Sequence, residues 1–211
     1  MFKYLIWSIC LLALFSCGPQ QNGNNENKAE PAVEKMEITD PSGNVERFSR
    51  RVSDYARHGE YTRTSPDGHL LESAYYVNDS LHGERVLYYA TGDTQIVETY
   101  KHGLFEGPYR AYYTNKQLEL AGQYVANTME GEWRRYYDTG QLMEIVNFQE
   151  NAENGPFQEF YQNGKPKAEG FYKDGDNEHG LLKLYDESGE LIRTMNCING
   201  VCRTVWSKDN S

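Results

Sequence analysis

The stretch GEWRRYYDTGQLMEIVNF, residues 131–148, decides the fold because the chain contains more than one version of it. A similar string, GPYRAYYTNKQLELAGQY, occupies residues 107–124, and a third, GPFQEFYQNGKPKAEGFY, occupies residues 155–172. The three copies start 24 residues apart. Self-similarity at a fixed period of this size is the signature of a repeat architecture, so the period must be explained before any single motif.

Six glycines mark the starts of the copies, and nine residues after each of these anchor glycines another glycine follows, except in the third copy, which has Lys116. Aromatic residues recur five and 17 residues after most anchors, as Tyr136 and Phe148 do in the fourth copy. The anchors, at intervals of 24, 24, 24, 24 and 25 residues, are Gly59, Gly83, Gly107, Gly131, Gly155 and Gly180. A content of 17 tyrosines and 19 glycines suits a protein made of strands and tight turns.

Each copy has the pattern of a β-hairpin. Alternating aromatic and polar residues precede a glycine-containing loop, such as D-T-G at residues 138–140, which suits a type I turn with glycine in the left-handed position. This loop pairs Tyr136 with Leu142. Because side chains alternate across a strand, Phe148 is expected on the same face as that pair and Trp133 on the opposite face.

A second turn joins each hairpin to the next, so the strands should follow one another up and down. We predict an all-β fold, an elongated antiparallel meander of about six 24-residue β-hairpin repeats in a single twisted sheet. The repeats span residues 59–196. An N-terminal capping half-repeat is expected over residues 36–58, and a C-terminal capping hairpin with a tail over residues 197–211.

The C-terminal cap contains two cysteines. The Asn-Gly pair at residues 199–200 is a strong signal for a two-residue hairpin turn. It makes Cys197 and Cys202 a non-hydrogen-bonded pair with Cα atoms about 4.5 Å apart, within the range of a disulfide. We predict a disulfide between them. The alternative is two reduced thiols, with Cys197 replacing the aromatic residue of the other repeats.

The first 16 residues have the composition of an export signal. Lys3 precedes a mostly apolar run over residues 4–15, which is shorter than the roughly 20 residues that a membrane-spanning helix needs. The sequence LFSC at residues 14–17 resembles the lipobox of bacterial lipoproteins, in which a lipid is attached to the cysteine. We predict lipidation of Cys17. The alternative is an ordinary signal peptide cut after Ser16, which leaves a free thiol.

Residues 17–35 are rich in Asn and Gln and too polar to form a core, so they are predicted to be a flexible tether. The expected location is the bacterial cell envelope, with the chain lipid-anchored to a membrane and facing the periplasm. The formal net charge is −10, which repels nucleic-acid phosphates and anionic lipid headgroups. A nucleic-acid partner is therefore excluded, and the lipid anchor is the expected membrane contact.

The unit G-x-W-x-x-Y-Y-x-x-G-x-L, best preserved as GEWRRYYDTGQL from Gly131, resembles the MORN-repeat variant. That variant occurs in bacterial proteins grouped as YwqK-type antitoxins of toxin–antitoxin systems. The resemblance covers about residues 36–206 and is strongest over residues 83–172. It implies a hairpin-repeat fold and carries no catalytic or binding residues over to this chain. The lipobox departs from what a cytoplasmic antitoxin needs.

The sequence has no nucleophile elbow, phosphate-binding loop or metal-ligand set. Glu60, Glu84 and Glu132 recur after their anchors about 10 Å apart by strand spacing. General acid–base pairs in glycosidases are closer, at about 5–9 Å, and lie in a pocket. Histidines such as His82 precede anchors at the same spacing, too far apart to share a zinc ion. We expect no enzymatic activity, no cofactor and no metal.

The tyrosines admit two interpretations. In the structural one, equal positions of successive repeats stack into ladders that hold the hairpins together. In the functional one, the aromatic residues two and six positions after the anchors form a continuous strip, of the kind that marks interaction sites. This candidate binding strip consists of Tyr89, Tyr109, Tyr113, Trp133, Tyr137, Phe157 and Tyr161.

From these features we predict a non-enzymatic, membrane-tethered lipoprotein that acts as a protein-binding module in the bacterial envelope. Its partner is an unidentified protein, and the chain itself is expected to be a monomer. The alternative is an antitoxin or immunity protein that neutralises a toxin, which an adjacent toxin-like reading frame would favour.

Overall fold

The computed structural model describes residues 30–210, so the predicted signal peptide and Cys17 lie outside the described residues. Seventeen strands form one open antiparallel sheet, and the described residues contain no α-helix. The predicted all-β hairpin meander is therefore confirmed. The strands of the N-terminal half are β1 (Val33–Thr39), β2 (Val45–Arg51), β3 (Arg57–Thr64), β4 (Leu70–Val77), β5 (Ser80–Leu81), β6 (Gly83–Tyr88), β7 (Thr94–Lys101), β8 (Leu104–Phe105) and β9 (Gly107–Tyr112).

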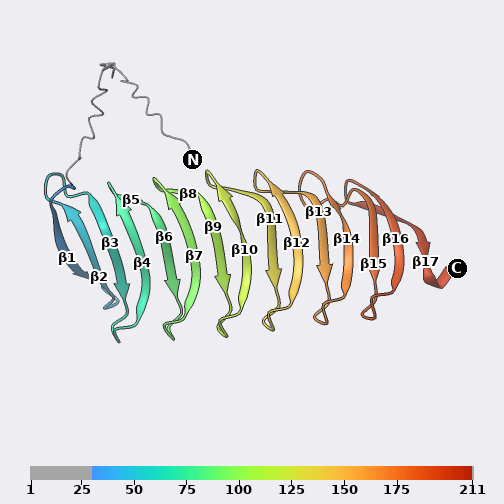
Figure 1. Cartoon of the computed structure of the whole chain (residues 1–211), viewed down its shortest axis with the longest axis horizontal. Coiled ribbons are helices and arrows are strands. Elements are labelled where there is room, and N and C mark those ends of the chain that lie inside the picture. Colours follow the sequence, from blue (N-terminus) through green and yellow to red (C-terminus); the bar gives the residue numbers. More distant parts are fainter. Residues whose placement is uncertain (1–29, 211) are drawn as a thin grey trace, which may run out of the picture. The chain divides into compact units, whose positions relative to one another are not determined.

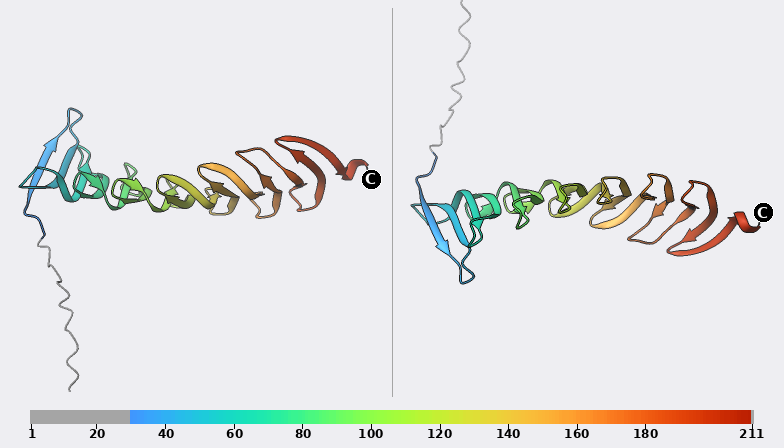
Figure 2. Two further views of the ribbon diagram at one scale, coloured as in Figure 1. Left: turned by 90° about the horizontal axis from the view of Figure 1, so that it is seen from above. Right: turned by 90° about the horizontal axis from the view of Figure 1, so that it is seen from below.

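The C-terminal half continues the same pattern to a final 3₁₀ turn, η1 (Lys208–Asn210). Its strands are β10 (Leu118–Val125), β11 (Thr128–Tyr136), β12 (Leu142–Gln149), β13 (Ala152–Phe160), β14 (Pro166–Tyr172), β15 (Gly180–Tyr185), β16 (Leu191–Ile198) and β17 (Val201–Ser207). Strands lie side by side in chain order, from β1 at one edge to β17 at the other (Figure 1). The strands are seen at changing angles along the sheet in Figure 2, so the sheet twists.

The hairpin loops follow the predicted geometry. In the fourth repeat the Tyr137 amide donates to the Gln141 carbonyl (2.8 Å), and the Gly140 amide donates to the Tyr137 carbonyl (2.8 Å). Gly140 has a φ of 84°, the left-handed conformation that favours glycine. Tyr136 pairs with Leu142, as the loop length predicts.

A β-bulge in each hairpin corrects one expectation about the faces. The pairing of β11 with β12 shifts between Arg135 and Tyr136, so one extra residue enters β12. Phe148 pairs with Gly131, and its ring centroid lies 6.1 Å from that of Trp133. Phe148 therefore lies on the face of Trp133, and the prediction that placed it with Tyr136 was wrong because it assumed unbroken alternation.

Turns at the opposite ends of the strands link each repeat to the one before it. Five of them are two-residue turns with positive φ at both positions, the type I′ geometry that matches strand twist. The turn after β14 is longer, and in it the Lys173 amide donates to the Asn177 carbonyl (3.0 Å). In each turn the second amide donates to a carbonyl 22 residues earlier. Examples are Asn127 to Phe105 (3.0 Å), Asn151 to Met129 (3.3 Å) and Gly200 to Glu178 (3.0 Å). These hydrogen bonds join each hairpin to its neighbour at the strand ends opposite the hairpin loops.

One face of the sheet holds the core, and we call it the core face. It carries the residues two positions after each anchor and their cross-strand partners, such as Trp133 with Val146 and Phe157 with Gly170. Large rings lie over small residues. A Cβ on Gly122 would lie 2.1 Å from the Trp133 ring, so only glycine fits there. This pairing of large with small buries Trp133 and Phe157 to 3 % exposure, although no second layer of strands or helices covers the sheet among the described residues.

Both ends of the sheet carry complete hairpins. Strand β1 begins at Val33 and pairs with β2 from Val33 to Thr39, so the predicted tether over residues 17–35 overlaps the sheet by three residues. The local sequence there is polar, and only the cross-strand pairing fixes it as a strand. At the other end a disulfide joins Cys197 to Cys202, with Cα atoms 4.0 Å apart in the expected cross-strand pair.

Candidate protein-binding surface

The predicted aromatic strip separates into two rows with different surroundings. The first row, Tyr109, Trp133 and Phe157, belongs to the core face. Trp133 and Phe157 are buried, and the Tyr109 ring centroid lies 5.7 Å from that of Trp133. Burial raises the pKa of the Tyr109 hydroxyl, and the charge of Glu98 adds to the rise. These rings fill the interior, so they do not contribute to an exposed strip.

The second row interlocks neighbouring repeats. Tyr113 donates its hydroxyl to the Tyr136 carbonyl (2.7 Å), and Tyr137 donates to the Phe160 carbonyl (2.8 Å). Tyr89 and Tyr161 also donate their hydroxyls to a carbonyl of the next repeat, those of Tyr112 (2.6 Å) and Tyr185 (2.8 Å) respectively. The four rings are half-buried. This row clamps hairpin to hairpin at the loop side of the sheet, which is the structural interpretation of the tyrosine pattern.

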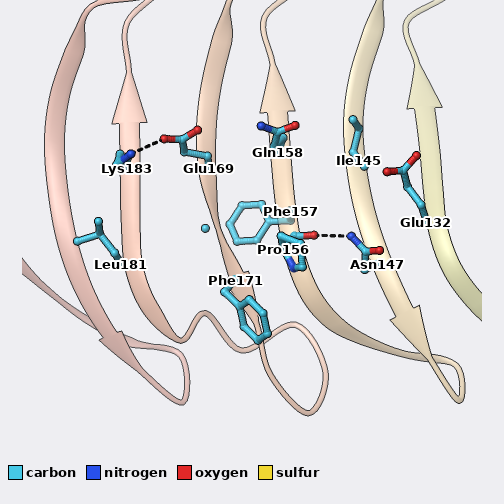
Figure 3. A pocket seen from close by; sticks show the side chains of 11 residues that line it. Glu132, Ile145, Asn147, Pro156, Phe157, Gln158, Glu169, Phe171, Leu181 and Lys183 are labelled. Carbon is cyan, nitrogen blue, oxygen red and sulfur yellow. Dashed lines mark hydrogen bonds and ion pairs between the residues drawn. The ribbon is translucent and has the colours of Figure 1, made fainter.

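The opposite face, which we call the open face, has a shallow groove near the C-terminal end of the sheet. It has a volume of about 370 Å³ and crosses β11 to β15. Phe171 on β14 and Leu181 on β15 line it with exposed fractions of 42 % and 53 %, beside Pro156 on β13 (Figure 3). Phe157 and its cross-strand partner Gly170 belong to the core face, so Phe171, the residue after Gly170, points to the open face. Leu182 also points to the core face, so Leu181, the residue before it, points to the open face as well.

Polar groups around the groove are paired with one another. Lys183 donates to the Glu169 carboxylate (2.7 Å), and the Tyr185 hydroxyl donates to the same oxygen (2.7 Å). These hydrogen bonds lower the pKa of Glu169, so the carboxylate stays ionised at neutral pH. Asn147 donates its side-chain amide to the Pro156 carbonyl (2.8 Å), as Figure 3 shows. The groove is thus an apolar centre with a fixed polar border.

Phe171 and Leu181 were not among the predicted site residues, although the sequence contains a signal for both. Phe171 lies 16 positions after its anchor, where the third, fourth and sixth repeats carry Gln123, Asn147 and Asn196. Leu181 lies one position after its anchor, where other repeats carry glutamate or proline. An apolar residue at a position that is usually polar marks the open face rather than the core.

A second missed feature is an ionic cluster on the core face of the second repeat. Arg85 takes the place of the core aromatic residue, and its guanidinium binds Glu98 (2.9 Å) and Glu72 (2.6 Å). Glu98 is buried at 8 % exposure and also accepts a hydrogen bond from the Tyr100 hydroxyl (3.1 Å). Burial and the charge of Glu98 raise the pKa of Tyr100 to about 12. The paired departures at Arg85 and Glu98 could have identified this cluster from the sequence.

Residues 30–210 were searched for metal-ligand clusters and for candidate membrane-spanning helices. No group of three or more His, Cys, Asp or Glu side chains there is arranged to hold a metal ion. His82 and His102 come together, with ring centroids 5.2 Å apart, but without a third ligand among the described residues. No helix in that part of the chain is long and apolar enough to cross a membrane.

These features define a β-hairpin repeat protein whose neighbouring hairpins are joined by hydrogen bonds at both ends of the strands. The sequence profile of the MORN repeat variant matches four stretches of the chain: residues 81–102, 129–150, 153–174 and 178–199. They contain the second, fourth, fifth and sixth anchor glycines, so the predicted MORN-variant repeats are confirmed in these four hairpins. A search of curated proteins finds no match to the chain. The YwqK-type assignment and the lipoprotein signal stay predictions.

The first and third hairpins fold in the same register without matching the profile. Thr64 replaces the aromatic residue in the first, and Lys116 replaces the loop glycine in the third. Lys116 nevertheless adopts the left-handed conformation, with a φ of 71°. The ladders from neighbouring hairpins therefore impose the repeat geometry even where the local sequence departs from it.

Proposed function

We propose that the chain is a non-enzymatic, membrane-tethered β-repeat lipoprotein that acts as a protein-binding module in the bacterial envelope. The observation that carries the binding role is the groove on the open face. Its apolar centre is held on neighbouring strands of one continuous sheet, so a partner meets a surface that is already ordered.

The composition of the groove supports binding. Exposed Phe171 and Leu181 can anchor a partner, and the surrounding Glu169–Lys183 pair supplies a polar border. Protein interfaces have this arrangement of a few apolar or aromatic anchors inside a polar rim. The charged groups of the groove are all held in ion pairs, Glu169 with Lys183 and Glu132 with Arg134, which supports a binding role rather than acid–base chemistry.

The tether completes the proposal. With β1 starting at Val33, residues 17–32 connect Cys17 to the sheet, and a flexible chain of that length reaches about 20–24 Å. A lipid on Cys17 would keep the sheet beside the membrane and leave the groove accessible from the periplasm. If Cys17→Ala leaves the protein in the membrane fraction after a high-salt wash, the lipid anchor is refuted.

The binding role is tested by crosslinking and affinity capture from intact cells with variants of the groove. Phe171→Glu and Leu181→Glu should each abolish capture of the partner that the wild type retains. Leu104→Glu is the matched control, because Leu104 has a similar exposure of 45 % and does not line the groove. Each variant must retain the wild-type unfolding midpoint. Equal loss in the control, or full capture by both groove variants, would remove the groove from the proposal.

A further inference from the structure

The two edges of the sheet differ in how they are protected. Strand β1 carries Glu34, Lys35 and Glu37 among its seven residues. Two of these charges are held across the sheet, Glu34 by Arg50 (2.8 Å) and Glu37 by Arg47 (2.9 Å). Charged residues along an edge strand are a common protection against pairing with another chain.

Strand β17 has less of that protection, because Arg203 is the only charged residue among its seven. Its exposed residues include Val201 at 67 %, Val205 at 62 % and Trp206 at 39 %. It contains no proline, and among the described residues it pairs with β16 alone. An edge that is apolar and unpaired is a template for strand addition.

At two positions of β17 the backbone amide and carbonyl form no hydrogen bond with β16. Cys197 and Cys202 have Cα atoms 4.0 Å apart, the separation of a non-hydrogen-bonded pair. The amide and carbonyl of Cys202 therefore point away from β16. Because the pattern alternates, the amide and carbonyl of Thr204, which lies opposite Met195, also point outward.

The side chains between these positions define the chemistry of an added strand. Val201 and Arg203 flank Cys202 along the strand, so their side chains lie on the open face. Val205 follows Thr204 as the extra residue of a bulge, and its side chain is exposed. Arg203 is exposed and forms no ion pair with any residue in the range 30–210. An acidic residue directly opposite Arg203 would be favourable, as would apolar residues opposite the two valines.

We propose that β17 binds an extended segment of a partner protein, which adds to the sheet as a further strand. The segment has the pattern apolar–x–acidic–x–apolar, with the acidic residue opposite Arg203. Main-chain hydrogen bonds at Cys202 and Thr204 supply affinity and the alternating side chains supply selectivity, as in other cases of strand addition. The inference rests on the proposed protein-binding function and places a second contact beyond the groove.

A second copy of the chain fits this edge less well. Two β17 strands that use both outward amides must pair around Arg203, which places Arg203 opposite Arg203. Like charges directly opposite each other destabilise a strand pair. The charge pattern therefore favours an acidic segment of another protein.

The test uses two synthetic peptides, TVTETVT and TVTKTVT, titrated against the purified full chain. Hydrogen exchange of individual amides reports the binding position, and a binding isotherm reports affinity. The glutamate peptide should protect the Cys202 and Thr204 amides and bind about 5-fold more tightly than the lysine peptide, from the energies of opposite and like charge pairs. Arg203→Glu should reverse that preference.

A second pair of variants separates strand addition from general loss of structure. Thr204→Pro removes an outward amide that β16 does not use and should abolish protection, whereas Thr204→Val should retain it. Equal affinity for the two peptides, an unchanged preference in Arg203→Glu, or protection at β1 instead would each overturn the proposal. Dimerisation without peptide that Thr204→Pro prevents would assign the edge to a second copy. Peptide binding that survives Phe171→Glu separates this outcome from failure of the groove.

Discussion

The second and fourth hairpins share one register but fill the core face with different chemistry. In the fourth, Trp133 pairs with Val146, and the rings of Tyr124 and Phe148 pack against the indole. In the second, the same two positions hold Arg85 and Glu98. The core has an N-terminal apolar cluster around Tyr61 and a C-terminal one around Phe157. Arg85 and Glu98 lie between them, together with the buried rings of Tyr100 and Trp133.

The difference teaches that the hairpin ladder, rather than the core residues, sets the register. Both hairpins have the bulge in the strand that follows the loop, and both have the loop-closing hydrogen bonds. The core residues instead change the free energy of unfolding. An apolar pair stabilises its repeat by burial, whereas a buried ion pair has a desolvation cost that its attraction only partly offsets.

The largest effect is expected from the apolar repeat. Trp133→Ala should lower the free energy of unfolding by about 4 kcal/mol, because it removes a buried ring and leaves a cavity above Gly122. Urea unfolding measures this loss. Tyr136→Ala, in the same strand but on the other face, is the control and should cost much less. Equal losses would contradict the assignment of the core face.

The next effect concerns the ionic repeat. Arg85→Ala should cost about 3 kcal/mol, because it leaves the buried carboxylate of Glu98 without its cation. Replacing all three charges by the residue types of other repeats, with Arg85→Tyr, Glu98→Ala and Glu72→Leu, should restore stability to at least the wild-type value. A triple variant as unstable as Arg85→Ala would show that the ion pair stabilises the fold outright.

A smaller, pH-dependent effect on stability is expected from Glu144, in the C-terminal half. Burial raises the pKa of Glu144, and Glu159 adds to the rise against the opposing charge of Arg135. The folded state holds this proton more tightly than the unfolded state, so the contribution of Glu144 to stability falls as pH rises above its usual value of 4.5. Glu144→Gln should therefore raise stability at pH 7 by less than about 1 kcal/mol and have little effect at low pH.

Glu169 gives the control of opposite sign. Its pKa is lowered, first by the hydrogen bond from Lys183, so its contribution is present above the usual carboxyl pKa and disappears as pH falls. Glu169→Gln should reduce stability at pH 7. Thermal unfolding midpoints of both variants between pH 3 and pH 7 decide the matter, because the contribution of Glu169 is lost only below the usual carboxyl pKa. Slopes of the same sign would refute the assignment.

The smallest effect is expected at the departure in the third loop. Lys116→Gly should stabilise by about 0.5 kcal/mol, because relief of the left-handed conformation exceeds the added freedom of the unfolded chain. The lost ion pair with Asp93 matters little, since the Lys116 side chain is 71 % exposed. Gly92→Lys, at an equivalent position with open space around it, should lose a similar amount. If Lys116→Gly is less stable than the wild type, the ion pair of Lys116 with Asp93 contributes more than relief of the left-handed backbone conformation.

The period of the sequence was sufficient to predict the sheet, the loop pairing at Tyr136 and Leu142, and the number of hairpins. It was insufficient to predict the faces, because a bulge changes the alternation without leaving a residue-type signal of its own. The strip was misjudged for a different reason. Sequence spacing places Trp133 and Tyr137 on one side, but only the packing shows that one ring is interior and the other a clamp.

The groove could not be predicted as a surface, since it depends on where β14 and β15 meet. Phe171 is conspicuous in the sequence only once the core face is known. The start of β1 at Val33 was missed because polar edge strands look like linker in composition, and their order comes from the neighbouring strand.

The turn hydrogen bonds have a consequence for how such a chain acquires its fold. Each one joins residues 22 positions apart, whatever the position of the repeat in the chain. Inserting or removing a whole hairpin would therefore leave every loop that must close during folding at the same length. Since folding rate depends on the separation of contacting residues, array length is free to vary without slowing the search for the native state.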